Sequence, residues 1–194
     1  MKGIIFTEFL EMVEQEFGVI TTDAMLRTSD LASGGAYTSV GSYDHQEILR
    51  MVENLSQATG IPEADLARTF GSYLFRRFSR LYAHFFEGIT DAFDMLSRID
   101  SYIHVEVRKL YEDAELPRVL YHKFDDGTVQ LIYRSTRPFA NVAEGLIRGC
   151  ITHYGDDIRV ERLIDDDYTI ANHTYAVFVL TRVPYAIAEV GLTK

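Results

Sequence analysis

The sequence has almost no cysteine and no long apolar run, and these two absences limit the class of protein it encodes. Cys150 is the single cysteine among 194 residues, which excludes an intrachain disulfide and a zinc or iron–sulfur site built on several thiolates. No apolar stretch approaches the roughly 18 residues that a membrane-spanning helix needs. The apolar run at residues 4–6 is also far too short for a secretory signal. We therefore expect a cytoplasmic protein.

Positive charge is scarce as well. Lysine and arginine together number 19 against 29 aspartates and glutamates, so the formal net charge is −10. A protein that coats nucleic acid or docks on anionic lipid needs a basic face. The charge balance therefore argues against a nucleic acid or a membrane as partner. At 194 residues and 47% hydrophobic, the chain is long enough for one domain with a sizeable core.

Several catalytic and cofactor-binding motifs are missing. The chain has no GxSxG nucleophile pattern, no phosphate-binding P-loop, no GxGxxG and no HExxH zinc pattern. Cys150 and His153 are three residues apart on one predicted helix, which is a possible spacing for a metal pair. Without a second cysteine, a small buried thiol beside a surface imidazole is the more common arrangement. The sequence thus shows no pattern of a catalytic acid, base or nucleophile.

The spacing of apolar residues changes from helical to alternating at Pro117. Before it, the pattern predicts helices at residues 3–17, 22–31, 44–59, 62–88 and 90–111. After it come two hairpins separated by one helix: strands at 118–124 and 128–137, a helix at 140–155, and strands at 157–166 and 173–183. The tight turns of these hairpins are expected at 125–127 and 166–167. This order predicts an α+β fold with a four-stranded antiparallel sheet.

His104 lies on the flank of the apolar stripe of the helix predicted at 90–111. On the two preceding turns, Ser97 and Ser101 are small enough to leave room beside it for a flat ligand. A histidine at such a boundary is also compatible with an ordinary core or surface residue, so this position alone leaves a ligand role open.

Tyr133, Ser135 and Arg137 alternate along the strand predicted at 128–137, so their side chains are expected on one face. A phenol, a hydroxyl and a guanidinium that converge there would suit an anion with several oxygens, since arginine offers a planar fork and a fixed charge. An ordinary exposed strand face gives the same pattern, and the three residues alone do not decide between the two.

The order and spacing of these residues resemble the haem nitric oxide/oxygen-binding (H-NOX) family over essentially the whole chain. The resemblance rests on four segments: MKGIIFTEFLEMVE at 1–14, IHVEVRKLY at 103–111, LPRVLYHK at 116–123 and YRSTR at 133–137. It implies a single domain, 1–194, in which a helical N-terminal subdomain (1–61) packs on a haem-binding α+β subdomain (62–194). The four-stranded sheet of that subdomain would enclose the cofactor, haem b.

The resemblance also implies a role for particular residues. His104 corresponds to the proximal histidine that binds the haem iron. Tyr133, Ser135 and Arg137 correspond to the family's clamp on the two propionates, and Pro117 to the proline that presses on the macrocycle and distorts it. Glu112 is a departure, because many relatives have a proline there, but it lies beyond the ligand.

The residues that correspond to the family's distal pocket are apolar in this chain. Val142 stands where relatives that bind O₂ have a distal tyrosine, and Leu74 and Phe9 stand where they have supporting residues. The whole predicted pocket comprises Ile5, Phe9, Leu74, Phe78, Val142 and Leu146. A hydrogen bond to a charged acceptor is worth about 1.5–3 kcal/mol, so its absence lowers O₂ affinity roughly 10- to 150-fold. Ordinary core packing would place the same residue types there.

This pattern predicts a sensor that binds NO, and also CO, at ferrous haem and excludes O₂. With no catalytic pattern, we expect no enzyme activity and signalling in trans. In the family, the partners of stand-alone members are typically sensor histidine kinases or cyclic-di-GMP enzymes. The hypothesis is that NO weakens or breaks the bond between the iron and His104, which shifts the helix that carries it.

Two other readings stay open. A haem enzyme of oxidative or peroxide chemistry would need a distal histidine or arginine to transfer protons. His84 is the one histidine near the distal part of the helix predicted at 62–88. A cofactor-free interaction module would use Tyr133, Ser135 and Arg137 to bind a peptide carboxylate.

Overall fold

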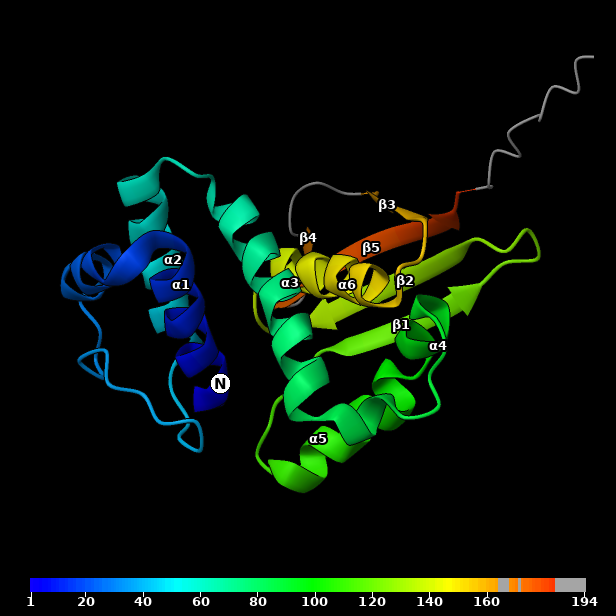
Figure 1. Cartoon of the computed structure of the whole chain (residues 1–194), viewed down its shortest axis with the longest axis horizontal. Coiled ribbons are helices and arrows are strands. Elements are labelled where there is room, and N and C mark those ends of the chain that lie inside the picture. Colours follow the sequence, from blue (N-terminus) through cyan, green and yellow to red (C-terminus); the bar gives the residue numbers. More distant parts are fainter. Residues whose placement is uncertain (164–167, 171, 184–194) are drawn as a thin grey trace, which may run out of the picture.

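A computed structural model describes residues 1–163, 168–170 and 172–183. Helices α1 (Gly3–Thr28) and α2 (His45–Thr59) lie on one side and an antiparallel sheet lies on the other, with helices α3 (Glu63–Leu81) and α6 (Ala140–Tyr154) between them (Figure 1). The predicted α+β class is therefore confirmed.

The N-terminal helices follow the predicted pattern closely. α1 runs through both helices predicted at 3–17 and 22–31, but Gly18 interrupts it with φ 81° and ψ 162°, a conformation that glycine adopts without steric cost. α2 begins after Asp44, whose side chain accepts a hydrogen bond from the Gln46 backbone, and ends at Gly60 in the left-handed region. The break at Gly18 and the bounds of α2 are thus as predicted.

The two longest predicted helices are wrong in their extent. α3 ends at Leu81 and a short 3₁₀ helix, η1 (Ala83–Phe86), follows, where the sequence predicts one helix to residue 88. The helix predicted at 90–111 is divided into α4 (Ala92–Ser97), a π-helical turn η2 (Ile99–Ile103) and α5 (His104–Leu110). The Ile103 amide bonds back five residues to the Arg98 carbonyl at 3.0 Å, which makes the turn wider. Apolar spacing does not distinguish this turn from an α-helical one.

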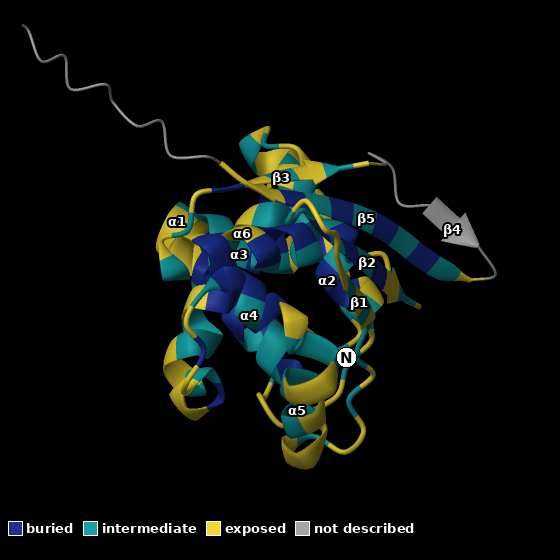
Figure 2. Cartoon of the chain, turned by 90° about the vertical axis from the view of Figure 1, so that its right-hand side faces the viewer, coloured by how far each residue is buried: buried dark blue, intermediate teal, exposed yellow. Residues whose placement is uncertain are grey.

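The sheet contains the four predicted strands in the order β1-β2-β5-β3, all antiparallel. They are β1 (Arg118–Lys123), β2 (Val129–Ser135), β3 (Ile158–Arg162) and β5 (His173–Arg182). A short strand that the sequence did not predict, β4 (Tyr168–Ile170), pairs with β5. Buried and half-buried positions alternate along β5 (Figure 2), as expected for a sheet packed on one face. The turn predicted at 166–167 lies outside the described residues.

Two apolar cores fill the molecule, one among α1, α2 and α3 and the other between the sheet, α4 and α6. Leu146 of α6 packs against both cores. α3 and α6 approach so closely that a Cβ atom at Gly71 would lie 2.1 Å from the Val142 carbonyl oxygen, and one at Gly145 would lie 2.1 Å from that of Arg68. The glycines therefore set the distance between these two helices.

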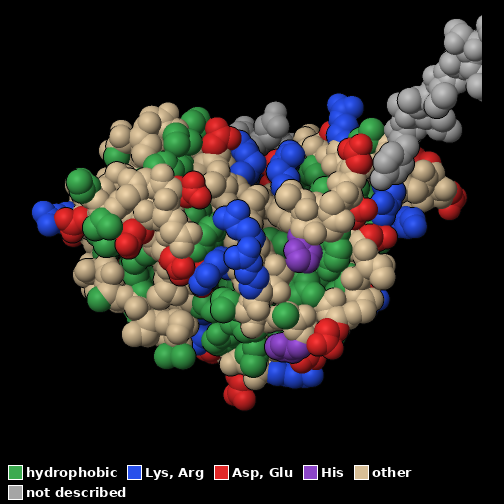
Figure 3. Space-filling model, in the orientation of Figure 1, with side chains coloured by type: hydrophobic (Ala, Val, Ile, Leu, Met, Phe, Trp, Pro, Cys, Tyr) green, Lys and Arg blue, Asp and Glu red, His purple; other side chains and the backbone are tan. Residues whose placement is uncertain are grey.

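On the outer face of α3, positively charged side chains gather over the helix (Figure 3). One of its arginines, Arg77, forms an ion pair with the buried Glu8 of α1 at 2.6 Å, which ties α3 to the N-terminal core. Among the described residues, no helix is long and apolar enough to cross a membrane.

Candidate functional site

A cavity of about 450 Å³ is lined by residues from both cores and by the segment that joins α5 to β1. Its volume lies in the range in which proteins bind small molecules and cofactors. Most of the wall is aliphatic or aromatic, contributed by α1, α3, η2, α5, β2 and α6. Such a wall favours a mostly apolar ligand.

His104 is the first residue of α5 and lines this cavity with only 12% of its side chain exposed. Its Nδ1 lies 2.9 Å from the Asp100 carboxylate, which assigns the proton to Nδ1 and leaves Nε2 as the nitrogen that can bind a metal. Burial lowers the pKa of His104, although Asp100 opposes the shift. The neutral imidazole that results is the form that coordinates metals.

Asp100 is a residue of the site that the sequence analysis missed. It lies in η2, and besides His104 it accepts hydrogen bonds from the Val119 backbone amide at 3.1 Å and from the Arg118 guanidinium at 3.2 Å. It therefore connects the histidine to the start of β1. The sequence did contain a signal for this contact, because residues four apart on a helix, such as Asp100 and His104, have neighbouring side chains.

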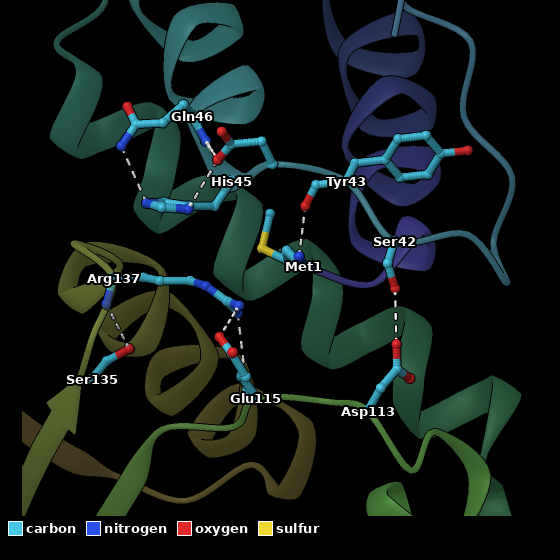
Figure 4. Close-up of polar contacts among 10 residues, drawn as sticks. Met1, Ser42, Tyr43, His45, Gln46, Asp113, Glu115, Ser135 and Arg137 are labelled. Atoms are coloured by element: carbon cyan, nitrogen blue, oxygen red, sulfur yellow. Dashed lines mark hydrogen bonds and ion pairs between the residues drawn. The ribbon is translucent and has the colours of Figure 1, made fainter. Parts of the chain in front are cut away.

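Tyr133, Ser135 and Arg137 all line the cavity, but not on one strand face as predicted. β2 ends at Ser135, and Arg137 follows in the turn before α6. The Arg137 backbone amide donates to the Ser135 hydroxyl at 3.1 Å (Figure 4), a local bond that bends the chain away from the strand. The Arg137 guanidinium makes an ion pair with Glu115, the second residue that the sequence analysis missed.

The remaining predicted positions are distributed as follows. Pro117 lines the cavity from the segment between α5 and β1. The distal candidates on the wall are Ile5, Leu74, Phe78, Val142 and Leu146. The prediction that Phe9 belongs to the distal pocket is wrong, because its side chain does not line the cavity. It is fully buried in the N-terminal core and packs edge-on against Phe70 at 5.1 Å, and Phe70 lines the cavity in its place.

Besides Tyr133, the wall holds the phenols of Tyr82 and Tyr111, so it is not apolar throughout. The hydroxyls of Tyr82 and Tyr111 lie 3.2 Å apart and hydrogen-bond to one another. Burial, and then this hydrogen bond, raise the pKa of Tyr82, which keeps its phenol neutral. Because one hydroxyl donates to the other, a single O–H of the pair stays available to a ligand.

The other histidines and the cysteine lie away from this wall. Among the described residues, His104 is the one histidine that lines the cavity. His84 is exposed on η1 against Phe85. Cys150 is fully buried with its thiol 3.9 Å from the Ala92 carbonyl, and His153 is exposed, so they do not form a metal pair. Within the described ranges, no three His, Cys, Asp or Glu side chains could hold a metal ion.

Together these residues fit haem. The wall suits an apolar macrocycle, the Nε2 atom of His104 suits its iron, and the side chains of Tyr133, Ser135 and Arg137 suit its carboxylates.

Comparisons with known proteins agree with this fit. The sequence profile of a family described as Haem-NO-binding matches residues 2–162. No curated protein matches the sequence.

Three solved structures are similar over nearly the whole chain. The Fe(II) unliganded H-NOX protein from K. algicida is 33% identical, with a TM-score of 0.85 and coverage of 96% of this chain and 98% of that one. The H-NOX from Shewanella woodyi in the Fe(II)CO ligation state is 40% identical, with a TM-score of 0.79 and 98% of each chain covered. An H-NOX protein from S. oneidensis in the Fe(II)NO ligation state is 27% identical, with a TM-score of 0.83 and coverage of 94% and 100%.

Proposed function

Because this chain belongs to the Haem-NO-binding (H-NOX) family, we propose that it senses nitric oxide through haem, excludes O₂ and signals to a separate partner protein. The family consists of haem-based gas sensors, and haem is the cofactor of this chain. When bound, haem supplies a ferrous iron that takes up diatomic gases. The proposal concerns which gas this chain selects and how its own residues respond.

His104 would hold the iron through Nε2, while the Asp100 carboxylate keeps the imidazole in the correct tautomer and orientation. Arg137 and the hydroxyls of Tyr133 and Ser135 would hold the propionates at the end of β2. Pro117 would press on the macrocycle from the segment that follows α5.

The observation that carries NO selectivity is the composition of the distal wall. The five distal candidates on the wall are aliphatic or aromatic, without a hydrogen-bond donor in their side chains (Ile5, Leu74, Phe78, Val142 and Leu146). A hydrogen-bond donor in this place would favour O₂ binding by about 1.5–3 kcal/mol, and these side chains supply none, whereas NO would bind without such a donor. These five side chains therefore favour NO over O₂. Relatives in the Fe(II)NO and Fe(II)CO states support NO and CO as ligands.

A pair of variants at Val142 tests this selectivity. Val142→Tyr adds a hydroxyl to the distal wall, and Val142→Phe adds similar bulk without the hydroxyl. We expect the tyrosine variant to bind O₂ roughly 10- to 150-fold more tightly than the phenylalanine variant, measured by O₂ titration of the reduced proteins. Wild-type protein that binds O₂ as tightly as Val142→Tyr would refute the proposed exclusion.

For signalling, the geometry around His104 supplies a route. His104 would tie α5 to the cofactor, and α5 and η2 would be free to shift if that tie were lost. Asp100 would pass this movement to β1 through its bonds to Val119 and Arg118. A sensor histidine kinase or a cyclic-di-GMP enzyme would respond to the changed surface, and the chain itself would not catalyse a reaction.

The signalling step is tested with a candidate sensor histidine kinase and purified holoprotein. We expect NO to change kinase autophosphorylation in the presence of wild-type protein. His104→Gly protein supplied with imidazole, which holds the haem without a bond to α5, should control the kinase in the same way with and without NO. If NO still changed kinase activity through this variant, His104 release would not be the signal.

A further inference from the structure

Two acidic side chains of the segment between α5 and β1 (residues 111–117) bind to other parts of the fold. Asp113 accepts hydrogen bonds from Lys2 at 2.9 Å and Ser42 at 3.1 Å, which ties the segment to the N-terminal core. Glu115 faces Arg137, and Figure 4 shows the two side chains directed toward one another. The segment thus lies between the N-terminal core and the arginine at the cavity wall.

Glu115 accepts one hydrogen bond from each terminal nitrogen of the Arg137 guanidinium. Nη2 makes an ion pair with the Glu115 carboxylate, and Nη1 donates to its backbone carbonyl at 3.3 Å. The Arg137 side chain is 15% exposed, whereas that of Glu115 is 72% exposed. Glu115 therefore reaches in from solvent to a guanidinium that is otherwise enclosed.

Two further ionisable groups, the Met1 amino group and His45, lie close to this pair. The Met1 amino group donates to the Tyr43 carbonyl at 2.6 Å, and its pKa is lowered by burial and by the nearby Arg137. The pKa of His45 is lowered by burial and, in part, by Arg137 as well. The Arg137 guanidinium, which lowers both pKa values, thus attracts a carboxylate to this position, whether it belongs to the protein or to a ligand.

We propose that Glu115 is an internal carboxylate that competes with a haem propionate for Arg137, and so sets how firmly the protein retains its cofactor. A guanidinium offers an end-on fork of Nη1 and Nη2 and a side-on fork of Nε and Nη2, and a propionate paired bidentately at either fork would share Nη2 with the Glu115 carboxylate. A second carboxylate at the fork is also repelled by the first. Binding of the propionate then displaces Glu115 toward solvent.

This inference rests on the proposed role of Arg137 as a propionate ligand, but not on the choice between NO and O₂. Displacement of Glu115 would release one of the two fastenings of the segment that contains Pro117, while Asp113 would keep the other. The occupancy of the propionate site would thus be linked to the segment that follows the histidine helix.

The test measures the rate at which ferric holoprotein loses haem to excess apomyoglobin. Because an exposed ion pair has a small net energy, we expect Glu115→Gln to release haem about threefold more slowly than wild type. Glu112→Gln is the matched control, since it removes the same charge from an exposed position in the same segment without contact to Arg137. Release by Glu115→Gln that is unchanged, or faster, would overturn the competition.

Two further measurements distinguish this inference from its premise. Arg137→Gln should release haem faster than wild type, and adding Glu115→Gln to it should have no further effect, as in a double-mutant cycle. If Arg137→Gln retained haem like wild type, Arg137 would not be the propionate ligand and the competition would fail with it. In haem-free protein, Glu115→Gln should lower Tm relative to Glu112→Gln. Equal Tm values would contradict the ion pair itself.

Discussion

At the scale of single residues, Asp100 links the histidine of the site to the sheet. Its carboxylate contacts the His104 ring, the Val119 amide and the Arg118 guanidinium, so it both orients the histidine and joins η2 to β1. A carboxylate that accepts the Nδ1 proton makes the other ring nitrogen a stronger metal ligand. The strength of the iron–histidine bond should therefore depend on Asp100.

Replacing this carboxylate by a neutral amide tests the dependence. Asp100→Asn should weaken haem binding about 10- to 100-fold, the usual effect of removing such a partner, and should also change the iron–histidine stretching frequency. The measurements are the haem dissociation rate and resonance Raman spectroscopy of the reduced protein. Asp94→Asn, which removes a carboxylate that binds Arg98 instead, serves as control. Equal stretching frequencies in Asp100→Asn and wild type would contradict the role of Asp100.

His45 gives a pH-dependent prediction at the same scale. Its pKa is lowered by burial, and by Arg137 and Met1, against the opposing effect of Asp44. Protonation therefore favours the unfolded chain: the contribution to stability is complete above the unfolded pKa of about 6.5 and is lost as the pH falls toward the lower folded value. Between about pH 7 and pH 5, roughly the range of this titration, the Tm of His45→Gln should fall less than the Tm of wild type. Thermal unfolding at each pH measures this difference. Parallel Tm profiles would contradict this assignment.

At the scale of secondary-structure elements, the pair α3 and α6 positions the distal wall. α3 contributes Leu74 and Phe78, and α6 contributes Val142 and Leu146. The two helices meet at backbone distance through Gly71 and Gly145, with no side chain between them at that point. The width of the distal pocket is therefore coupled to this contact.

Enlarging one of these glycines should separate the helices. In Gly145→Ala the new methyl group would meet the Arg68 carbonyl oxygen at 2.1 Å, and backbone cannot move aside as a flexible side chain can. We expect a loss of about 1–3 kcal/mol in the free energy of unfolding, measured by urea denaturation. Thr152→Ala, on the exposed side of the same helix, should change stability far less. Wild-type stability in Gly145→Ala would show that the helices are not constrained there.

The elements also show what sequence patterns can predict. α2 was predictable because Asp44 and Gly60 mark its ends, and the hairpin β1–β2 because two alternating runs surround a turn. The π-turn η2 was not, because its residues continue the apolar spacing of the helices on either side. The position of Arg137 beyond β2 depends on a local bond to Ser135, which the Y-x-S-x-R pattern does not reveal.

At the scale of the whole molecule, the cavity is built from distant parts of the chain. Ile5 of α1, His104 of α5 and Val142 of α6 line the same wall. Residue patterns alone indicated a possible ligand at His104 and an anion at Arg137, and the family resemblance was needed to place both in one haem site. Contacts across the fold, such as Glu115 with Arg137, depend on three-dimensional packing and could not be predicted from spacing.

The absorption spectrum of the reduced protein, recorded without oxygen and then with NO or with air, tests the central claim most directly. We expect a haem Soret band that shifts when NO is added, and no stable O₂-bound spectrum in air. A stable O₂-bound spectrum would contradict the apolar distal wall and would point to the paired hydroxyls of Tyr82 and Tyr111 as donors. Absence of any haem band after reconstitution would contradict the site itself, because His104 would then have no iron to bind.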